Sequence, residues 1–234
     1  DVTICAPNCT TLTATPVPSN QTTSYTQAII PYAPDPFNVG TAVALTDDSQ
    51  TGLLPLPFPF CYYGVVYNSF VIGSNGWLGF SATTSTWVIT NPIPDASGSS
   101  PRNCIMGPWH DVNPSVGGTI RYQTYGVSPC RRLVVSWNAV PMYSCGTPAT
   151  QQITIYETTN IIDVYIQDKP ICAAWNAGAA ILGIQNATGT VAYSASNYNF
   201  PTNWAATNEG WRFMPSGAPN WTFAWFDMSA TQIS

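Results

Sequence analysis

Apolar and polar residues alternate with a period of two along much of the chain, which is the pattern of half-buried β-strands. The clearest case is the stretch QQITIYETTNIIDVYIQ at residues 151–167. A turn centred between Thr158 and Thr159 gives this stretch one apolar face and one largely polar face. In that register Ile155 faces Ile162. The residues therefore predict an antiparallel hairpin.

The register of this hairpin also predicts a disulfide. It places Thr154 opposite Asp163 on the polar face. Extended toward the open end of the hairpin, it brings Cys145 opposite Cys172. Facing positions of an antiparallel pair lie within the distance that a disulfide spans, so we expect these two cysteines to be bonded.

Other apolar runs predict further strands. Residues 53–64, LLPLPFPFCYYG, alternate leucine and phenylalanine with proline. Because proline cannot donate to a β-ladder, this stretch is predicted to be an edge strand with a buried apolar face. Asn75-Gly76 lies between two apolar runs, 70–72 and 77–80, and predicts a tight hairpin. Additional strands are predicted at residues 118–125, 131–140 and 179–185.

The fold class follows from these short strands. No stretch shows the periodicity of a full helix, and the turns between strands predict an all-β fold, an antiparallel, jelly-roll-like β-sandwich stabilised by disulfides. The Pro- and Thr-rich residues 1–40 are expected to form an N-terminal arm packed on the core, and residues 41–215 the sandwich. Residues 216–234 contain a linker and an aromatic strand, which either begins an Ig-like module or pairs with an edge of this domain.

Charge is scarce in this chain. Only 7% of the residues are charged, against about 25% in an ordinary soluble protein. Six basic residues and a net charge of -5 leave no basic patch for phosphate groups, so nucleic acid and anionic membrane surfaces are not expected partners. No apolar run approaches the roughly 20 residues of a membrane-spanning helix, so direct membrane insertion is not expected either.

The seven cysteines are scattered, without the paired spacing of a zinc site. Disulfides in an oxidising compartment are the better interpretation, and we expect an extracellular, cell-surface location. The odd number leaves one cysteine over. Beyond the predicted bond, the pairing stays open for Cys5, Cys9, Cys61, Cys104 and Cys130.

The single histidine, His110, lies in the stretch IMGPWHDVNPSVGGTIRYQTYG at residues 105–126. A histidine beside a carboxylate can act as a general base, but adjacent side chains in a loop usually diverge. No Gly-x-Ser-x-Gly elbow presents a nucleophile, and no spacing singles out a carboxylate pair for glycoside hydrolysis. We expect no catalytic residues and interpret this stretch as a loop that leads into a strand at Thr119–Tyr125.

Calcium is the one cofactor that the sequence leaves open. Asp47, Asp48 and Asp111 offer the hard oxygen ligands that Ca²⁺ prefers, provided that two loops converge. The alternative is that these side chains cap their own turns, which is the commoner role of aspartate in loops.

Nine tryptophans exceed what one core requires. Those in predicted loops are candidates for stacking on a carbohydrate, with polar neighbours for its hydroxyl groups: Trp87, Trp109, Trp175 and Trp204. The alternative is that these rings seal the ends of the sandwich, the commoner role of a large aromatic side chain. Trp77, Trp137 and Trp211 lie in strand-like contexts and are expected in the core.

Six segments in this order resemble the surface adhesins that Bacteroidetes export by type IX secretion, including gliding-motility-associated proteins. The segments are LPFPFCYYGVVYNSFVIGSNGWLGF, IMGPWHDVNPSVGGTIRYQTYG, CRRLVVSWNAVPMYSC, QQITIYETTNIIDVYIQDKPIC, ILGIQNATGTVAY and WAATNEGWRFMPSG. The Phe-x-Phe-x-x-Tyr-Gly opening, the Ser-Asn-Gly hairpin and the Pro-Trp-x-Asp loop are more distantly similar to the nidogen-like extracellular domain.

The resemblance implies a non-catalytic extracellular adhesion or binding module of a large secreted bacterial surface protein. Its expected partners are surface polysaccharide or neighbouring protein modules. One alternative is a structural stalk or filament subunit that self-assembles by edge-strand addition. Another is a carbohydrate-binding module of a secreted enzyme.

Overall fold

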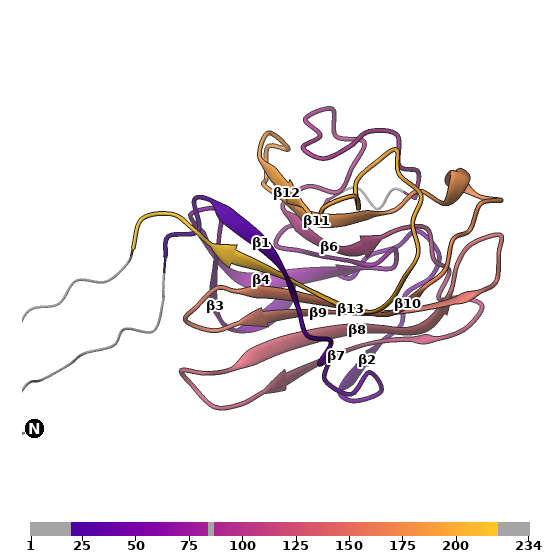
Figure 1. Ribbon diagram of the computed structural model, residues 1–234. Coiled ribbons are helices and arrows are strands. Elements are labelled where there is room, and N and C mark those ends of the chain that lie inside the picture. Colours follow the sequence, from indigo (N-terminus) through magenta and orange to yellow (C-terminus); the bar gives the residue numbers. More distant parts are fainter. Residues whose placement is uncertain (1–19, 84–86, 220–234) are drawn as a thin grey trace, which may run out of the picture.

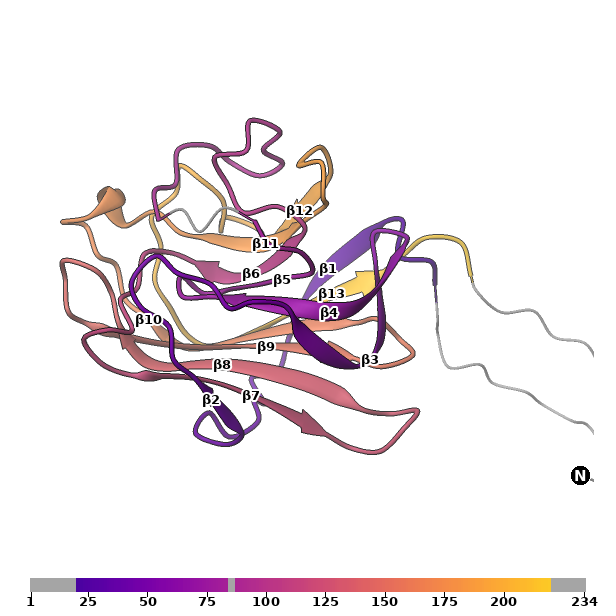
Figure 2. The same ribbon diagram turned by 180° about the vertical axis from the view of Figure 1, so that it is seen from behind.

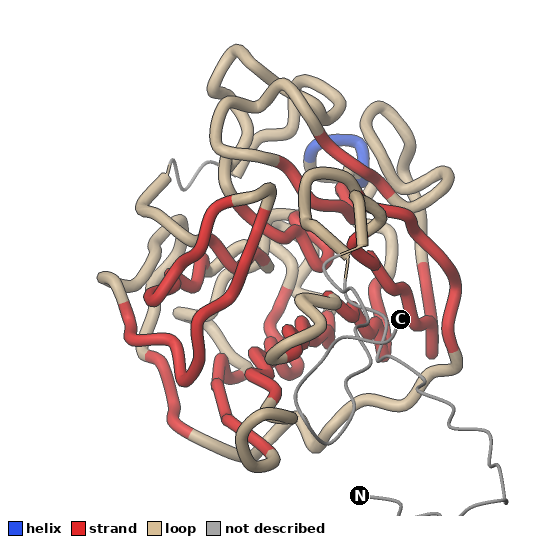
Figure 3. The backbone as a smooth tube through the Cα atoms, turned by 90° about the vertical axis from the view of Figure 1, so that its left-hand side faces the viewer, coloured by secondary structure: helices blue, strands red, loops and turns tan. Residues whose placement is uncertain are grey.

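The chain forms two antiparallel sheets packed face to face (Figure 1). The computed structural model describes residues 20–83 and 87–219. Residues 1–19 of the predicted N-terminal arm and nearly all of the predicted aromatic strand near the C-terminus lie outside the described residues. The two-sheet arrangement confirms the predicted all-β sandwich, and the described residues contain one helical turn, η1 (Asn176–Gly178), coloured blue in Figure 3.

The first sheet has seven strands. In spatial order they are β1 (Tyr25–Ile30), β13 (Ala206–Pro215), β10 (Ile162–Lys169), β9 (Pro148–Tyr156), β8 (Arg132–Pro141), β7 (Thr119–Tyr125) and β2 (Thr41–Val43). β1 and β2 come from the first 43 residues yet lie at opposite edges of this sheet. The N-terminal part of the chain therefore contributes both edges of the larger sheet.

The second sheet has six strands. Their order is β12 (Ala192–Ser194), β11 (Ile181–Gln185), β6 (Cys104–Trp109), β5 (Trp77–Gly79), β4 (Val65–Gly73) and β3 (Leu54–Tyr62). Figure 2 shows this sheet from behind, with β3 and β4 beside the larger sheet. β3 is the predicted edge strand, and its Phe58, Phe60 and Tyr62 are buried.

The local registers read from the sequence are confirmed. In the β9–β10 hairpin, Ile162 pairs with Ile155 and Asp163 with Thr154. A disulfide joins Cys145 to Cys172, with a Cα–Cα distance of 5.8 Å. The turn at residues 74–76 connects β4 to β5, as the Asn-Gly pair predicts. Of the other cysteines in the described part of the chain, three have free thiols: Cys61, Cys104 and Cys130.

The prediction of a loop from residue 105 onward was wrong for residues 105–109, because they belong to strand β6. β6 lies in the middle of the second sheet, between β5 and β11. Ile105 belongs to the core between the sheets, whereas Cys104 and Met106 belong to a second apolar cluster that also contains Ile89 and Ile93 of a long loop. Both faces of the strand are therefore covered, and a strand buried on both faces does not alternate apolar with polar residues.

The main core fills the space between the two sheets. Phe60 and Ile72 of the second sheet and Ile153 and Val164 of the first belong to it, all with no exposed surface. The three tryptophans predicted to be buried, Trp77, Trp137 and Trp211, are at most 6% exposed. Within the described residues, no helix has the length and apolar character needed to cross a membrane.

Candidate functional site

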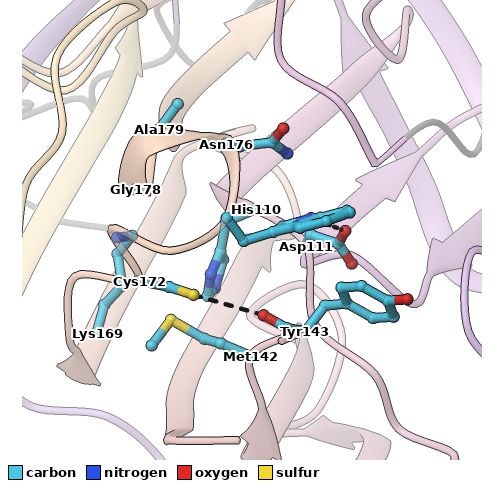
Figure 4. Close-up of a pocket in the computed structure, with 10 residues that line it drawn as sticks. His110, Asp111, Met142, Tyr143, Lys169, Cys172, Asn176, Gly178 and Ala179 are labelled. Atoms are coloured by element: carbon cyan, nitrogen blue, oxygen red, sulfur yellow. Dashed lines mark hydrogen bonds between the residues drawn. The ribbon is translucent and has the colours of Figure 1, made fainter. Parts of the chain in front are cut away.

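Loops from both sheets meet at one end of the sandwich. They comprise residues 44–53, 74–76, 110–118, 142–147 and 170–180. Asp111 is the meeting point: its backbone carbonyl accepts a hydrogen bond from the Tyr143 amide at 3.1 Å, and its Oδ2 accepts one from Trp175 Nε1 at 2.7 Å. Figure 4 shows Asp111 and Tyr143 on one side of a small pocket and Lys169 on the other, with His110 between them.

His110 is held as a neutral, structural side chain. It is 4% exposed, and its Nε2 lies 3.0 Å from Oε1 of Gln151. The pKa of His110 is lowered to about 3: burial is the largest cause and the charge of Lys169 adds to it, while the bond to Gln151 only partly opposes them. An imidazole held neutral in this way accepts no proton near pH 7. The hydrogen-bond partner of the imidazole is the Gln151 side-chain amide.

Lys169 is a buried cation that the sequence patterns do not reveal. The side chain is 1% exposed, and Nζ donates to the carbonyl of Trp204 at 2.8 Å and lies 4.5 Å from the centre of the Trp204 ring. Burial lowers the pKa of Lys169 to about 8. The pocket beside it holds about 20 Å³, which is room for about one water molecule and not for a substrate. Lys169 is the only lysine of the chain, and this was the one feature of the sequence that could have pointed to it.

Three aromatic rings form a partly exposed surface beside this pocket, here called the aromatic cluster: Trp87, Tyr143 and Trp175. The ring centres of Trp87 and Trp175 are 5.2 Å apart, and those of Tyr143 and Trp175 are 4.8 Å apart. Trp87 is 36% and Tyr143 37% exposed. Asn176 Nδ2 donates to the Trp87 carbonyl at 3.2 Å, which ties the loop of Trp87 to η1.

Two of the four tryptophans proposed from the sequence as ligand contacts lie elsewhere. Trp109, at the end of β6, has no exposed surface and packs in the second apolar cluster. Trp204 is 5% exposed, stacks on Tyr198 at 4.0 Å and donates to the Ala180 carbonyl. A ring covered on its faces cannot stack on a ligand, so burial removes both residues from the candidate surface. They match the alternative role of sealing the fold.

The three candidate metal ligands come together. One carboxylate oxygen from each of Asp47, Asp48 and Asp111 lies within 4.8 Å of the others, so the loops at 44–53 and 110–118 converge as calcium binding requires. Each carboxylate is also held by a neutral donor from another loop: Asn113 Nδ2 to Asp47 Oδ2 at 2.8 Å, Asn75 Nδ2 to Asp48 Oδ1 at 2.9 Å, and Trp175 Nε1 to Asp111 Oδ2.

The electrostatics of these carboxylates are unfavourable without a counter-charge. The pKa of Asp111 is raised to about 7: burial is the largest cause and the charges of Asp48 and Asp47 add to it, while the bond from Trp175 partly opposes them. Burial and the charge of Asp48 also raise the pKa of Asp47, against a backbone hydrogen bond at Asp48. The arrangement thus concentrates negative charge at the base of the aromatic cluster.

A family model described as NIDO related matches residues 20–224, which is most of the chain. The chain belongs to the NIDO-related family. Membership confirms the more distant of the two resemblances, the one to a nidogen-like domain. No curated protein and no solved structure matches the chain significantly.

The NIDO-related family is of a non-enzymatic module type with an extracellular binding or structural role. The Cys145–Cys172 disulfide agrees with an extracellular protein, because such bonds persist in oxidising compartments. The family model fixes neither the ligand nor the attachment of the domain, and the site geometry provides the basis for proposing a ligand.

Proposed function

We propose that this NIDO-related domain is a non-catalytic adhesion module that binds surface polysaccharide through the aromatic cluster. The observation that carries the proposal is the contact between Trp87, Trp175 and Tyr143, three rings that stay partly exposed at the loop end of the sandwich. Rings with both apolar faces and polar edges are the usual platform for the apolar face of a sugar.

The neighbours of the cluster supply hydrogen-bonding groups for sugar hydroxyls. Asn176 lies next to the Trp175 ring in sequence and is tied to the loop of Trp87. The buried Asp111 carboxylate accepts a hydrogen bond from the Trp175 indole N–H group, which fixes that ring. A platform whose central ring is already fixed loses little side-chain entropy when a ligand binds, which favours affinity.

The small size of the pocket favours binding at a surface over chemistry in a cavity. A volume of about 20 Å³ beside His110 and Lys169 excludes a sugar ring. A polysaccharide chain would instead lie along the open rings, where several successive residues of the polymer make contact. Binding of this kind is weak for each sugar and gains strength from repetition along the polymer.

The finer assignment rests on the sequence resemblance. In this proposal the domain is one module of a surface adhesin that a Bacteroidetes bacterium exports by type IX secretion and displays during gliding motility. The neighbouring modules of such a protein would provide attachment to the cell, and this domain would provide contact with the surrounding polysaccharide.

Glycan arrays and calorimetry with bacterial polysaccharides test the proposal. We expect the wild-type chain to bind, and Trp87→Ala and Tyr143→Ala each to weaken binding at least about tenfold, the loss of one stacked ring. Tyr125→Ala is the matched control, because Tyr125 is a partly exposed aromatic residue at the far end of β7. Absence of any glycan binding by the folded wild type, or equal binding by all variants, would contradict the proposal. Filaments in solution would instead favour a structural subunit.

A further inference from the structure

We propose that Asp47, Asp48 and Asp111 bind one calcium ion, which fastens the loop at residues 44–53 to the loop at 110–118. The proposal stands on the geometry of these carboxylates and does not depend on carbohydrate binding.

Two carboxylate oxygens at this place are buried without a partner. Oδ1 of Asp47 and Oδ1 of Asp111 have no hydrogen-bond partner among the described residues, and Asp111 as a whole is 9% exposed. A buried anionic oxygen without a donor is costly, so such atoms require an explanation. Because the second oxygen of each carboxylate accepts a bond from Asn113 or Trp175, the side chains are fixed while one oxygen on each remains available to a cation.

No basic side chain neutralises the three carboxylates. All six lysine and arginine residues of the chain lie in its described part. Arg131, Arg132 and Arg212 pair with Glu157, Asp35 and Asp163. The other three donate to backbone carbonyls: Arg102 to Ala96, Arg121 to Gly40 and Lys169 to Trp204. Within the described residues no lysine or arginine is left to neutralise these carboxylates, and a bound metal ion would supply the positive charge.

The ligand chemistry favours calcium. All three ligands are hard oxygens, whereas zinc and copper sites use cysteine or histidine. The nearby imidazole of His110 is engaged by Gln151. Calcium–oxygen distances of about 2.4 Å place opposite ligands about 4.8 Å apart, and magnesium requires a tighter octahedron with oxygens at about 2.1 Å. The separations of the three carboxylate oxygens, all within 4.8 Å, allow one calcium ion to contact all three. Asp48 is exposed, which gives the ion a route of entry and leaves coordination positions for water.

Calorimetry of the EDTA-treated full chain with calcium chloride tests the site. We expect one ion per chain, a Kd of about 0.1–1 mM as in other extracellular modules, and a weaker response to magnesium. Asp48→Asn and Asp111→Asn should each weaken binding at least about tenfold, because each removes a charged ligand. Asp168→Asn is the control, since Asp168 is an exposed carboxylate on β10 outside the cluster.

Terbium luminescence gives a second reading that does not depend on heat or on stability. Tb³⁺ replaces Ca²⁺ at oxygen sites, and the Trp175 indole bonded to Asp111 is close enough to sensitise its emission. We expect strong emission that calcium displaces, and much weaker emission at the same terbium concentration in Asp48→Asn. Asp48 is exposed, so Asp48→Asn is expected to fold, which circular dichroism checks. Absence of calcium binding by the wild type up to about 10 mM, tighter binding of magnesium, or unchanged affinity in folded Asp48→Asn would overturn the proposal.

Discussion

Arg212 on β13 lies directly opposite Asp163 on β10 and donates to both oxygens of its carboxylate. The two bonds measure 2.7 and 2.8 Å, and the Asp163 side chain has no exposed surface. The hydroxyl groups of Tyr156 and Tyr165 also donate to Asp163. This group joins β13 to the β9–β10 hairpin from which it is separated by more than 30 residues in sequence.

Loss of Arg212 should destabilise the fold strongly. Arg212→Leu leaves the fully buried Asp163 carboxylate with tyrosine donors only. Removing one partner of a buried pair costs about 3–5 kcal/mol, and we expect somewhat less here because 37% of the Arg212 side chain is exposed to solvent. Urea unfolding measures the change. Arg131→Leu is the comparison, because Arg131 is no more exposed than Arg212 (29% against 37% of the side chain), whereas its partner Glu157 keeps 11% of its side chain exposed and Asp163 none. A carboxylate that keeps contact with water loses less when its arginine is removed, so we expect a smaller loss. Equal losses in both variants would show that Asp163 does not depend on its arginine.

The Cys145–Cys172 disulfide should contribute substantially to stability. It closes a loop with a sequence separation of 27, for which the loss of chain entropy in the unfolded state predicts about 3.5 kcal/mol. The double variant Cys145→Ser/Cys172→Ser should lose about this amount in urea unfolding. Cys130→Ser changes an exposed free thiol and should leave stability unchanged within about 0.5 kcal/mol. A double variant as stable as the wild type would contradict the entropic argument.

Much of the local structure could be predicted from the sequence, because it depends on residues that are close together. The alternation at 151–167 fixed the β9–β10 register, and that register in turn predicted the disulfide. β6 was not predicted as a strand, because both of its faces are buried and its residues therefore do not alternate between apolar and polar. β13 was not predicted as a strand, because its partners β1 and β10 lie far away in the chain and no adjacent turn marks it.

The candidate site could be predicted only in part, for a similar reason. Asp47, Asp48 and Asp111 were identified by residue type, but their convergence depends on how the loops leave two different sheets. Sequence context could not separate the exposed Trp87 from the buried Trp109, because the burial of a ring depends on what covers it. Lys169 was missed because its partners are backbone carbonyls, which no side-chain pattern records.

Gly76 in the β4–β5 turn should tolerate no side chain. Its φ is +83°, and a Cβ atom there would lie 2.1 Å from the Pro108 carbonyl oxygen of the neighbouring strand. Gly76→Ala should therefore cost more than the about 1–2 kcal/mol of left-handed strain alone. Gly146→Ala isolates that strain, since Gly146 has φ +68° with nothing near its Cβ position. Thermal unfolding of both variants measures the difference, and equal melting temperatures would show that β6 moves away from the turn without cost.

The buried Lys169 should make the domain more stable as the pH rises from 7.5 to 9.5. Burial lowers its pKa from 10.5 to about 8, so in this range the folded protein loses the proton while the unfolded chain keeps it. Unfolding then takes up a proton at Lys169, which contributes an increase in stability of about 2 kcal/mol over the interval. The buried Cys104 thiol opposes part of this increase in wild type and variant alike, because burial raises its pKa and unfolding releases its proton. Lys169→Met should abolish this increase, because methionine fills a similar volume without titrating.

Above pH 10 the buried tyrosines act in the opposite direction, since burial raises the pKa of Tyr62 and Tyr63 and unfolding then releases protons. Urea unfolding at each pH, compared between wild type and variant, measures the effect. The same pH dependence in both would mean that Lys169 stays protonated in the fold, held by the Trp204 ring and its carbonyl oxygen.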